Sequence, residues 1–527
     1  MLVLALPGIV LALVCLVPFL NKAYTIDDPL FLLEARQILK TPLRPMSYGL
    51  CWMTNETCVA HAGDLGPGSA QALMGYLLVP VIMAGGAEWI AHLLQMALVC
   101  LIVFEMVRIA LRLGFSNVQS AVAGLLIVAI PPFLSMASTA MPDILALALG
   151  LTGMERLLAW KYEQRWHQAV TAGVALGLAP YARPHFAMFL PLGALWLFDE
   201  LGTREAVAQF RRQPRLWAPI LIAIGILVAV NLLTRDWGPT FEARNLEIRP
   251  EKIPLNLSAY LVYLCFPIPF TAVWLGVYWR KMLMPIAFLA GAFIAISGIL
   301  TSPWSLIRGW PIAAVLYGLV ALVDTIDRRT GPVGTLLSLW VLIPLPAIAY
   351  FHFPVKFMLA ASPAIALIII QTLAKLPPFT VSVVYGALVL GYAGFSCLLL
   401  EADADFAEYG RRAAAELIAP HVAVGERVWY GGEWGFYWYA QEAGARVSKP
   451  SERGPNPGDL LAVGLMEGGG ATLNRFPHRE LVDSRKYDSP HGRTMGFGAG
   501  LYSNSYGIVP WTWKPSGENV YELWRIQ

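Results

Sequence analysis

Residues 2–20 read LVLALPGIVLALVCLVPFL, and residues 24–29, a few positions further on, read YTIDDP. The first stretch carries no charge and is long enough to cross the roughly 30 Å hydrocarbon core of a bilayer. It lacks the basic start and the small-residue cleavage site of a secretory signal, so we expect a retained membrane span. The second stretch places two adjacent carboxylates, Asp27 and Asp28, where the chain leaves the lipid.

A short amphipathic helix is predicted directly after this pair. Apolar side chains at positions 30 to 33, 35, 38 and 39 fit a helix better than a strand. Such a helix would lie along the membrane surface and hold both acids at the interface. Asp28 is predicted as its N-cap, with Pro29 as the first helical residue. The pair therefore caps the helix, takes part in catalysis, or does both. The sequence leaves open which of the two acids would be catalytic.

Composition excludes a soluble enzyme, because 57% of the 527 residues are hydrophobic and only 14% are charged. A net charge of +3 without a basic run gives no support to nucleic-acid binding. Apolar stretches recur to about residue 399 and predict a polytopic all-α membrane protein with about 13 transmembrane helices. The predicted spans are residues 2–20, 88–112, 116–137, 143–160, 166–180, 186–200, 216–234, 256–279, 283–302, 310–326, 332–351, 357–374 and 379–399. The shorter run 70–84 is expected at the interface.

Lys and Arg residues orient these spans. With the N-terminus in the cytoplasm, the cytoplasmic turns hold more basic residues than the opposite face, as the positive-inside rule requires. An odd number of spans then places the first loop, 21–87, and residues 400–527 outside. We therefore predict a membrane domain over residues 1–399 and a small extracytoplasmic α/β domain over 400–527. The predicted elements of the second domain are helices at 406–418 and 435–443 and strands at 427–430 and 459–463.

Two groups of residues have more than one interpretation. Cys51 and Cys58 share the first outer loop, where a disulfide bond and two free thiols are equally compatible with the spacing. An aromatic cluster in the C-terminal part is either a sugar-stacking surface or, as we favour, a core beneath a glycine turn. Its members are Trp429, Tyr430, Trp434, Tyr437, Trp438 and Tyr439.

Ionisable residues from several separate segments fall on the predicted outer face. They are Asp27, Asp28, Asp143, Arg183, His185, Arg308 and Lys356. A single Arg at a membrane boundary is more often an anchor than a ligand, and a lone His is more often a hydrogen-bonded interface residue than a catalyst. Gathered on one face, however, these groups suit sugar transfer from a lipid phosphate. A carboxylate would take the proton of the acceptor hydroxyl, and the cations would stabilise the departing phosphate.

The order of these motifs resembles the GT-C glycosyltransferases, most closely the branch of the protein O-mannosyltransferases and lipid A aminoarabinose transferases. The resemblance covers about residues 1–375 and rests on the acid pair, on Pro142-Asp143 and on Lys356 before Pro363. It implies an inverting glycosyltransferase of the cell envelope, in a bacterial inner (plasma) membrane with its active site on the periplasmic side. The donor would be a polyprenyl-phosphate-linked sugar, and the acceptor a hydroxyl of a glycan, a lipid or a protein.

Residue roles follow from the same resemblance. Asp27 or Asp28 would be the catalytic base, and Asp143 a second acid near the acceptor or a metal. The resemblance implies Lys356 as a contact of the donor phosphate, and the shared outer face adds Arg183, Arg308 and His185 as further candidates. Relatives carry a Lys in the turn where this chain has Arg183, so Arg183 would replace that cation.

Metal dependence is a separate question. A hard cation would need oxygen ligands. The candidate ligands are Asp27, Asp28, Asp143 and either Asp64 or His61. No compact ligand motif such as a helical His-Glu-x-x-His is present in the sequence. We therefore expect a reaction without a cofactor, with a divalent cation as the alternative.

Two other functions use a similar surface. A flippase or transporter of lipid-linked sugars would place its charges near the middle of the bilayer and show broken helices in two related halves. Here the acids gather at one interface, and the sequence has no evident repeat. A polymerase or ligase that uses a diphosphate-linked glycan would share the same cations, so assays with different donors would separate it from the first hypothesis.

Overall fold

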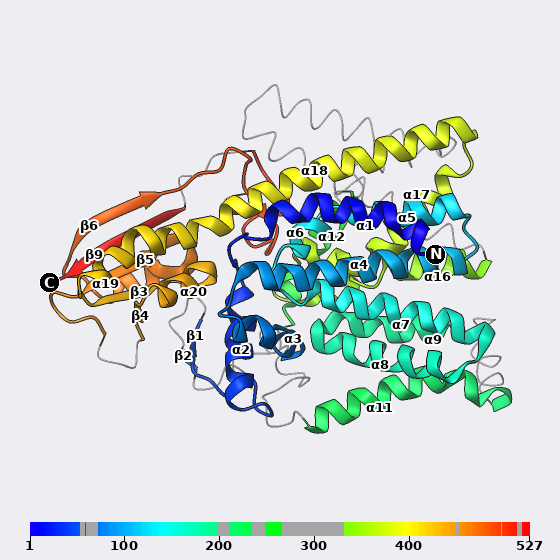
Figure 1. Ribbon diagram of the computed structural model, residues 1–527, viewed down its shortest axis with the longest axis horizontal. Coiled ribbons are helices and arrows are strands. Elements are labelled where there is room, and N and C mark those ends of the chain that lie inside the picture. The colour runs from blue at the N-terminus through cyan, green and yellow to red at the C-terminus, as the bar shows by residue number, and fades with distance from the viewer. Residues whose placement is uncertain are drawn as a thin grey trace.

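The computed structural model describes residues 1–52, 58–59, 72–197, 211–233, 248–265, 331–449, 454–496, 498–513 and 519–527. Arg308, His61 and Asp64 lie outside the described residues. The predicted spans 283–302 and 310–326 and the end of the span 256–279 also lie outside them. The rest of the chain forms a helical bundle, from which a smaller α/β part projects at one end (Figure 1).

The bundle contains helices of very different length. They are α1 (Leu2–Leu16), α4 (Glu88–Arg112), α5 (Asn117–Ala129), α6 (Phe133–Ala137), α7 (Asp143–Glu163), α8 (Trp166–Ala182), α9 (Phe189–Leu197), α11 (Ala218–Leu233), α12 (Ile253–Cys265), α16 (Gly331–Val341), α17 (Ser362–Leu373) and α18 (Pro378–Ala413). Short 3-10 turns extend or connect them: η1 (Val17–Phe19), η3 (Pro184–Met188), η4 (Pro214–Trp217), η7 (Pro250–Lys252), η8 (Leu345–Ala349) and η9 (Val355–Ala360). Helices α1, α4, α7, α8, α11 and α18 lie with their axes roughly parallel or antiparallel to one another (Figure 1).

Five helical segments among the described residues are long and apolar enough to cross a membrane, which identifies an integral membrane protein. They are Leu2–Phe19, Glu88–Arg112, Pro214–Leu233, Gly331–Ala349 and Pro378–Ala423. Other predicted spans form shorter helices. The span expected at 116–137 stops at Ala129, because Pro131 and Pro132 follow and proline cannot continue a helix. The run expected at the interface forms α3 (Ala72–Met83), only 12 residues long.

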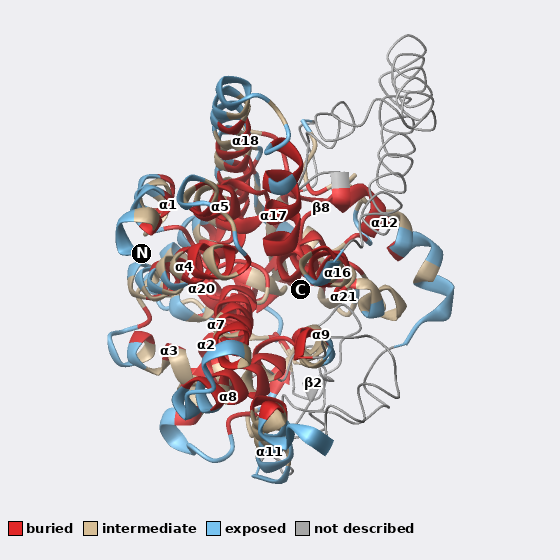
Figure 2. Ribbon diagram, turned by 90° about the vertical axis from the view of Figure 1, so that its right-hand side faces the viewer, coloured by how far each residue is buried: buried red, intermediate tan, exposed pale blue. Residues whose placement is uncertain are grey.

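Small residues let the helices pack closely. A Cβ atom on Gly8 of α1 would lie 2.6 Å from the carbonyl oxygen of Gly124 on α5. A Cβ atom on Gly173 of α8 would likewise meet Ile222 of α11 at 2.6 Å. Such contacts are typical of helix interfaces in membranes, where close backbone approach replaces the hydrophobic effect. Buried residues accordingly fill the middle of the bundle, while the outer faces of α11 and the tip of α18 are exposed (Figure 2).

The amphipathic helix after the first span is present as α2 (Asp28–Lys40), and it packs against α3. Its predicted cap is wrong by one residue. Asp27 is the N-cap and makes no side-chain capping bond, whereas Asp28 is the first helical residue. The loop that follows forms an antiparallel pair, β1 (Leu50–Cys51) with β2 (Cys58–Val59), in which Cys51 stands opposite Cys58. Cys51 is disulfide-bonded.

The C-terminal part is joined to the bundle by α18, which crosses residue 400 without a break and continues through η10 (Ala414–Ile418), a π-helical turn, and α19 (Ala419–Ala423). A five-stranded sheet follows, in the order β4-β3-β5-β9-β6. Strand β3 is parallel to both β4 and β5, whereas β9 is antiparallel to β5 and β6. The strands are β3 (Val428–Gly431), β4 (Arg446–Val447), β5 (Leu460–Gly464), β6 (Arg479–Lys486) and β9 (Val520–Ile526), with a separate pair β7 (Met495–Gly496) and β8 (Ala499–Gly500). Helix α20 (Trp434–Glu442) connects β3 to β4, and η11 (Leu465–Gly469) and α21 (Gly470–Asn474) follow β5.

Sequence patterns located most of these elements. The predicted strands at 427–430 and 459–463 and the helix at 435–443 match β3, β5 and α20. The glycine segment 468–470 turns within η11 and α21, and Gly468 takes a positive φ of 81° there. Of the aromatic cluster, Tyr430 is fully buried and only Trp434 is partly exposed, so these rings form a core, as we favoured.

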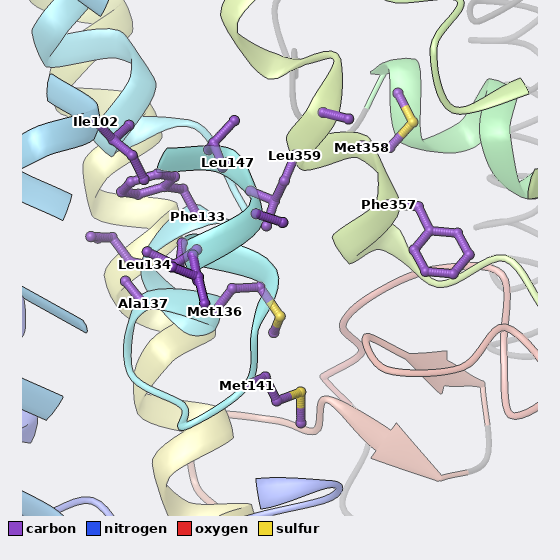
Figure 3. Close-up of a cluster of buried hydrophobic side chains, with 14 of the residues drawn as sticks. Ile102, Phe133, Leu134, Met136, Ala137, Met141, Leu147, Phe357, Met358 and Leu359 are labelled. Atoms are coloured by element: carbon purple, nitrogen blue, oxygen red, sulfur yellow. The ribbon is translucent and has the colours of Figure 1, made fainter. Parts of the chain in front are cut away.

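Helix α6 and the turn η9 form part of a hydrophobic layer. Helix α6 contributes Phe133, Leu134, Met136 and Ala137, and η9 contributes Leu359 (Figure 3). All of these side chains are almost fully excluded from solvent. Two residues of the site described next belong to elements anchored in this layer: Asp143 is the first residue of α7, and Lys356 is the second residue of η9.

Candidate functional site

Asp28 is buried and holds two chain segments together. One carboxylate oxygen accepts the Thr25 N–H at 2.9 Å, and the other accepts the Ala140 N–H at 2.8 Å. The side chain is 0% exposed. Burial raises the pKa of Asp28 to about 7, although the two N–H donors and Lys22 act to lower it. Asp28 therefore fixes the start of α2 against the turn that leads into α7.

Asp27 has a different environment although it is the adjacent residue. Its side chain is 33% exposed, and its Oδ2 lies 3.8 Å from Nζ of Lys356, which is almost fully buried. The residue before it, Ile26, has a φ of 44°, a conformation that β-branched residues rarely adopt. Strained backbone of this kind persists only where the surroundings impose it, and it is frequent at functional sites. The loop thus turns one acid inward and leaves the other accessible.

Asp143 and Arg183 form a bidentate ion pair. Arg183 donates from Nε to Oδ1 at 3.0 Å and from Nη2 to Oδ2 at 2.5 Å. Asp143 is the first residue of α7, where the helix dipole favours a negative charge, and Arg183 follows the last residue of α8. Both side chains are buried. The pair joins two of the segments that the sequence placed on one face.

Two histidines stand beside these charges. The ring of His185 packs against Phe357 at 4.6 Å and Phe186 at 4.9 Å between centroids. Its Nε2 atom is buried and has no hydrogen-bond partner in the described part of the chain. The sequence did not single out His352. Its Nδ1 atom forms a hydrogen bond with the Ser503 hydroxyl at 3.0 Å.

Lys356 is the common neighbour of the site. Its charge interacts with those of Arg183, Asp143, Asp27 and Asp28. Its Nζ also lies 3.7 Å from the sulfur of Met141, and both histidines lie within the electrostatic reach of its ammonium. Six of the seven residues predicted from sequence therefore come together, and the seventh, Arg308, lies outside the described residues.

The C-terminal part covers this site with a segment that the sequence did not reveal. The ring centre of Tyr502 lies 5.9 Å from Nζ of Lys356. Asn504 accepts the Phe353 N–H at 2.8 Å and donates to the side-chain oxygen of Asn256, also at 2.8 Å. These contacts join residues 151 and 248 positions apart, so no local spacing could predict them.

A buried ion pair supports the same arrangement from beside the acid loop. Lys22 donates to Asp403 of α18 at 2.5 Å and to the Ser138 hydroxyl at 3.0 Å. Asp403 also accepts the Tyr502 hydroxyl at 2.7 Å. Neither Lys22 nor Asp403 has an exposed side chain. The only sequence signal for Lys22 is its position just after the first span, which is equally typical of an interfacial anchor.

The acids differ in their availability to a metal. Among the residues that the structure describes, no three His, Cys, Asp or Glu side chains are grouped closely enough to hold an ion. Asp28 is engaged by two backbone N–H groups and Asp143 by Arg183, whereas Asp27 retains an exposed face.

Comparisons with known proteins found structural similarity alone. No protein-family model matches the chain, and no curated protein matches its sequence. Solved structures of three GT-C membrane glycosyltransferases are similar to it. ArnT from Cupriavidus metallidurans, bound to undecaprenyl phosphate, is 14% identical with a TM-score of 0.49 and covers 92% of this chain and 96% of its own.

The other two similar structures are more distant. The oligosaccharyltransferase AglB from Archaeoglobus fulgidus, in complex with an inhibitory peptide and a dolichol phosphate, is 11% identical with a TM-score of 0.47, over 90% of this chain and 72% of its own. The arabinosyltransferase EmbB from Mycobacterium smegmatis is 16% identical with a TM-score of 0.36, over 77% and 41% of the two chains.

Proposed function

We propose that this protein is an inverting glycosyltransferase of the GT-C type, which moves a sugar from a polyprenyl-phosphate donor to an acceptor hydroxyl at the membrane surface. The observation that carries the proposal is the contact between partly exposed Asp27 and buried Lys356 at 3.8 Å. The Asp27 carboxylate can reach solvent, and it stands next to the buried ammonium of Lys356. A carboxylate that acts as general base and a cation that binds the phosphate are the two groups that this reaction needs.

Asp27 is the proposed base. A general base must approach the hydroxyl whose proton it takes to within about 3 Å, and Asp27 has an exposed face for this approach. Asp28 is unsuited, because both of its oxygens accept backbone N–H groups inside the fold. The proton moves from the acceptor hydroxyl to Asp27 while the acceptor oxygen forms a bond with the anomeric carbon. The bond from that carbon to the phosphate oxygen breaks, which inverts the configuration.

Lys356 is the proposed counter-ion of the leaving phosphate. Burial strengthens its field, because little water screens the ammonium. A phosphate that takes Lys356 as its partner would release Asp27 from the ion pair, so donor binding would free the base. Arg183 acts mainly on Asp143, whose carboxylate it holds in two hydrogen bonds. His185 and His352 flank the same position and would hydrogen-bond the phosphate oxygens.

The orientation of the protein in the membrane is also part of the proposal. We place the site and the C-terminal part on the periplasmic side of a bacterial inner membrane, with the N-terminus in the cytoplasm and about 13 spans in all, on the charge bias of the turns. Labelling of single cysteines from each side of the membrane tests this orientation. No cofactor is part of the proposed reaction.

The decisive experiment compares a substitution in the candidate site with one on the C-terminal sheet. Purified protein is incubated with a panel of polyprenyl-phosphate sugars and candidate glycan, lipid and protein acceptors. Asp27→Asn should lower turnover at least about a hundredfold, as loss of a general base does, without a change in thermal stability. Asp483→Asn, on the exposed edge strand β6, is the matched control and should retain full activity. Full activity of Asp27→Asn would overturn its role as the base.

The choice of donor separates this proposal from the two alternative functions. Turnover with a monophosphate-linked sugar is expected, and activity restricted to diphosphate-linked glycans would assign a polymerase or ligase instead. Movement of the lipid-linked sugar across the bilayer without transfer would assign a flippase.

A further inference from the structure

Two tryptophans of the C-terminal part lie against a membrane-spanning helix. Trp511 packs on Phe395 of α18 with ring centroids 6.0 Å apart, and on Trp513 at 5.4 Å. Trp513 is 65% exposed. The proposed reaction uses neither ring, and an exposed indole on a soluble surface would cost free energy that a lipid contact would not.

The position of Phe395 on α18 indicates the depth of this pair. No charged residue occurs from Pro378 through Leu400, and Glu401 is the first. At about 1.5 Å per residue, Phe395 lies about 9 Å before Glu401 along the helix axis. A hydrocarbon core of about 30 Å that begins near Pro378 would end within a few residues of Phe395. The two tryptophans therefore stand at the level where hydrocarbon gives way to headgroups.

The lipid-facing surface of α18 continues to this level. Its apolar residues Phe379, Val383 and Leu390 are 82%, 55% and 75% exposed, as expected for side chains that face acyl chains. At about 100° per residue, Phe395 lies about 140° around the helix from Leu390, so the two tryptophans stand beside this exposed strip rather than in line with it. Indole rings are enriched at this depth because one edge is apolar and the N–H can be hydrogen-bonded.

The segment that presents the tryptophans is fixed by its backbone. Arg493 and Thr512 exchange two backbone hydrogen bonds, at 2.9 and 3.1 Å. Trp511 donates its indole N–H to the carbonyl oxygen of His491 at 2.9 Å. Gly492, with a φ of 91°, leaves room for this ring, since a Cβ atom there would lie 2.7 Å from the indole nitrogen. The backbone directly before Trp513 is thus fixed.

We propose that Trp511 and Trp513 dock the C-terminal part onto the bilayer interface, with phospholipid headgroups and upper acyl chains as the partner. The inference is independent of the proposed reaction, because it rests on α18 and on the exposure of one ring. Its effect on the site would be to hold the Tyr502–Asn504 segment, which precedes the tryptophans, over Lys356.

The test measures the environment of position 513 in the full-length protein in lipid nanodiscs. Cys15, Cys100, Cys265 and Cys397 are replaced by alanine, and a nitroxide is attached after Trp513→Cys or, as a control, Val424→Cys. Val424 is 77% exposed and directly follows α19, at the end of the C-terminal part that lies far from the bundle. Collision with oxygen, relative to collision with an aqueous nickel chelate, should be several-fold higher at 513 than at 424.

Equal accessibility at the two positions would overturn the proposal. Protection of position 513 that appears only when polyprenyl phosphate is added would also overturn it, and would assign the surface to a substrate chain. If the cysteine-substituted protein fails to fold, brominated lipids provide a second measurement on the native chain. Their acyl bromines should quench wild-type fluorescence more than that of Trp513→Phe. Identical quenching in the two proteins would contradict bilayer docking.

Discussion

At the scale of single residues, the main finding is that adjacent acids take different roles. A local rule predicted Asp28 as the cap of its own helix, but its carboxylate binds Ala140, 112 positions away. The sequence could identify the pair as important, since two acids after a span are unusual in lipid surroundings. It could not divide the roles, because the division is made by a turn that folds over the pair from elsewhere in the chain.

The buried pair of Lys22 and Asp403 should be important for stability. Asp403→Asn would leave Lys22 as a buried charge without a counter-ion and should cost about 3–5 kcal/mol. Thermal unfolding in detergent measures the loss. Glu442→Gln, which breaks the exposed pair with Arg36, is the control and should cost about 0–1 kcal/mol. Similar losses in both variants would show that burial of the Lys22 pair adds nothing.

Glu467 should make stability depend on pH. Burial raises the pKa of this carboxyl from 4.5 to about 8, although the Tyr521 hydroxyl donates to it and lowers the pKa. Glu467 is protonated over a wider pH range in the folded state than in the unfolded state, so its contribution to stability is fully present below about pH 4.5 and is lost as pH rises to about 8.

The melting temperature of wild type should therefore fall across this window, by the equivalent of a few kcal/mol. Glu467→Gln keeps an acceptor for Tyr521 and removes the charge, so its melting temperature should depend much less on pH. Glu480→Gln, at an exposed acid of β6, should retain the wild-type slope. A Glu467→Gln slope equal to that of wild type would exclude Glu467 as its source.

At the scale of elements, periodicity and composition predicted what is local. Helix α4 begins and ends at the predicted residues, and α2 follows the apolar spacing of residues 30–39. One error concerned where an element begins. The predicted helix 406–418 is a continuation of α18 rather than a separate element, because no glycine or proline interrupts the chain between residues 396 and 409.

The contact between α20 and the acid loop should tolerate no added atom. A Cβ atom on Gly435 would collide with the carbonyl oxygen of Tyr24, three residues before Asp27. Gly435→Ala should thus cost about 1–3 kcal/mol by overpacking and lower activity by displacing the acid. Gly470→Ala, where no atom lies within 4 Å, is the matched control and should be close to neutral. Wild-type activity and stability of Gly435→Ala would show that the loop adjusts freely.

At the scale of the whole molecule, the site is assembled from both parts of the chain. The bundle supplies the charges, and the C-terminal part supplies the cover of Tyr502, Ser503 and Asn504. The sequence separated the two parts by hydropathy, which is a local property. It gave no sign that the second part returns to the first, because that contact depends on hydrogen bonds between residues about 150 positions apart.

Asn504 should couple the stability of the two parts. Asn504→Ala would leave the Phe353 N–H and the Asn256 side chain without this partner, at a cost of about 1–3 kcal/mol. Hydrogen exchange should then speed up together in residues 350–360 and 499–512. Ser505→Ala, at an exposed neighbour, should change neither region. Faster exchange confined to 499–512 would show that the cover does not support η9.

The continuity of α18 has a mechanical consequence. Its 36 residues form a rod of about 54 Å, with one end in lipid and the other packed against α20 of the C-terminal part. Membrane helices respond to a thinner or thicker bilayer by tilting. A rigid helix transmits that tilt to the part of the chain that it carries, so bilayer thickness should change the height and angle of the C-terminal part relative to the charges of the candidate site.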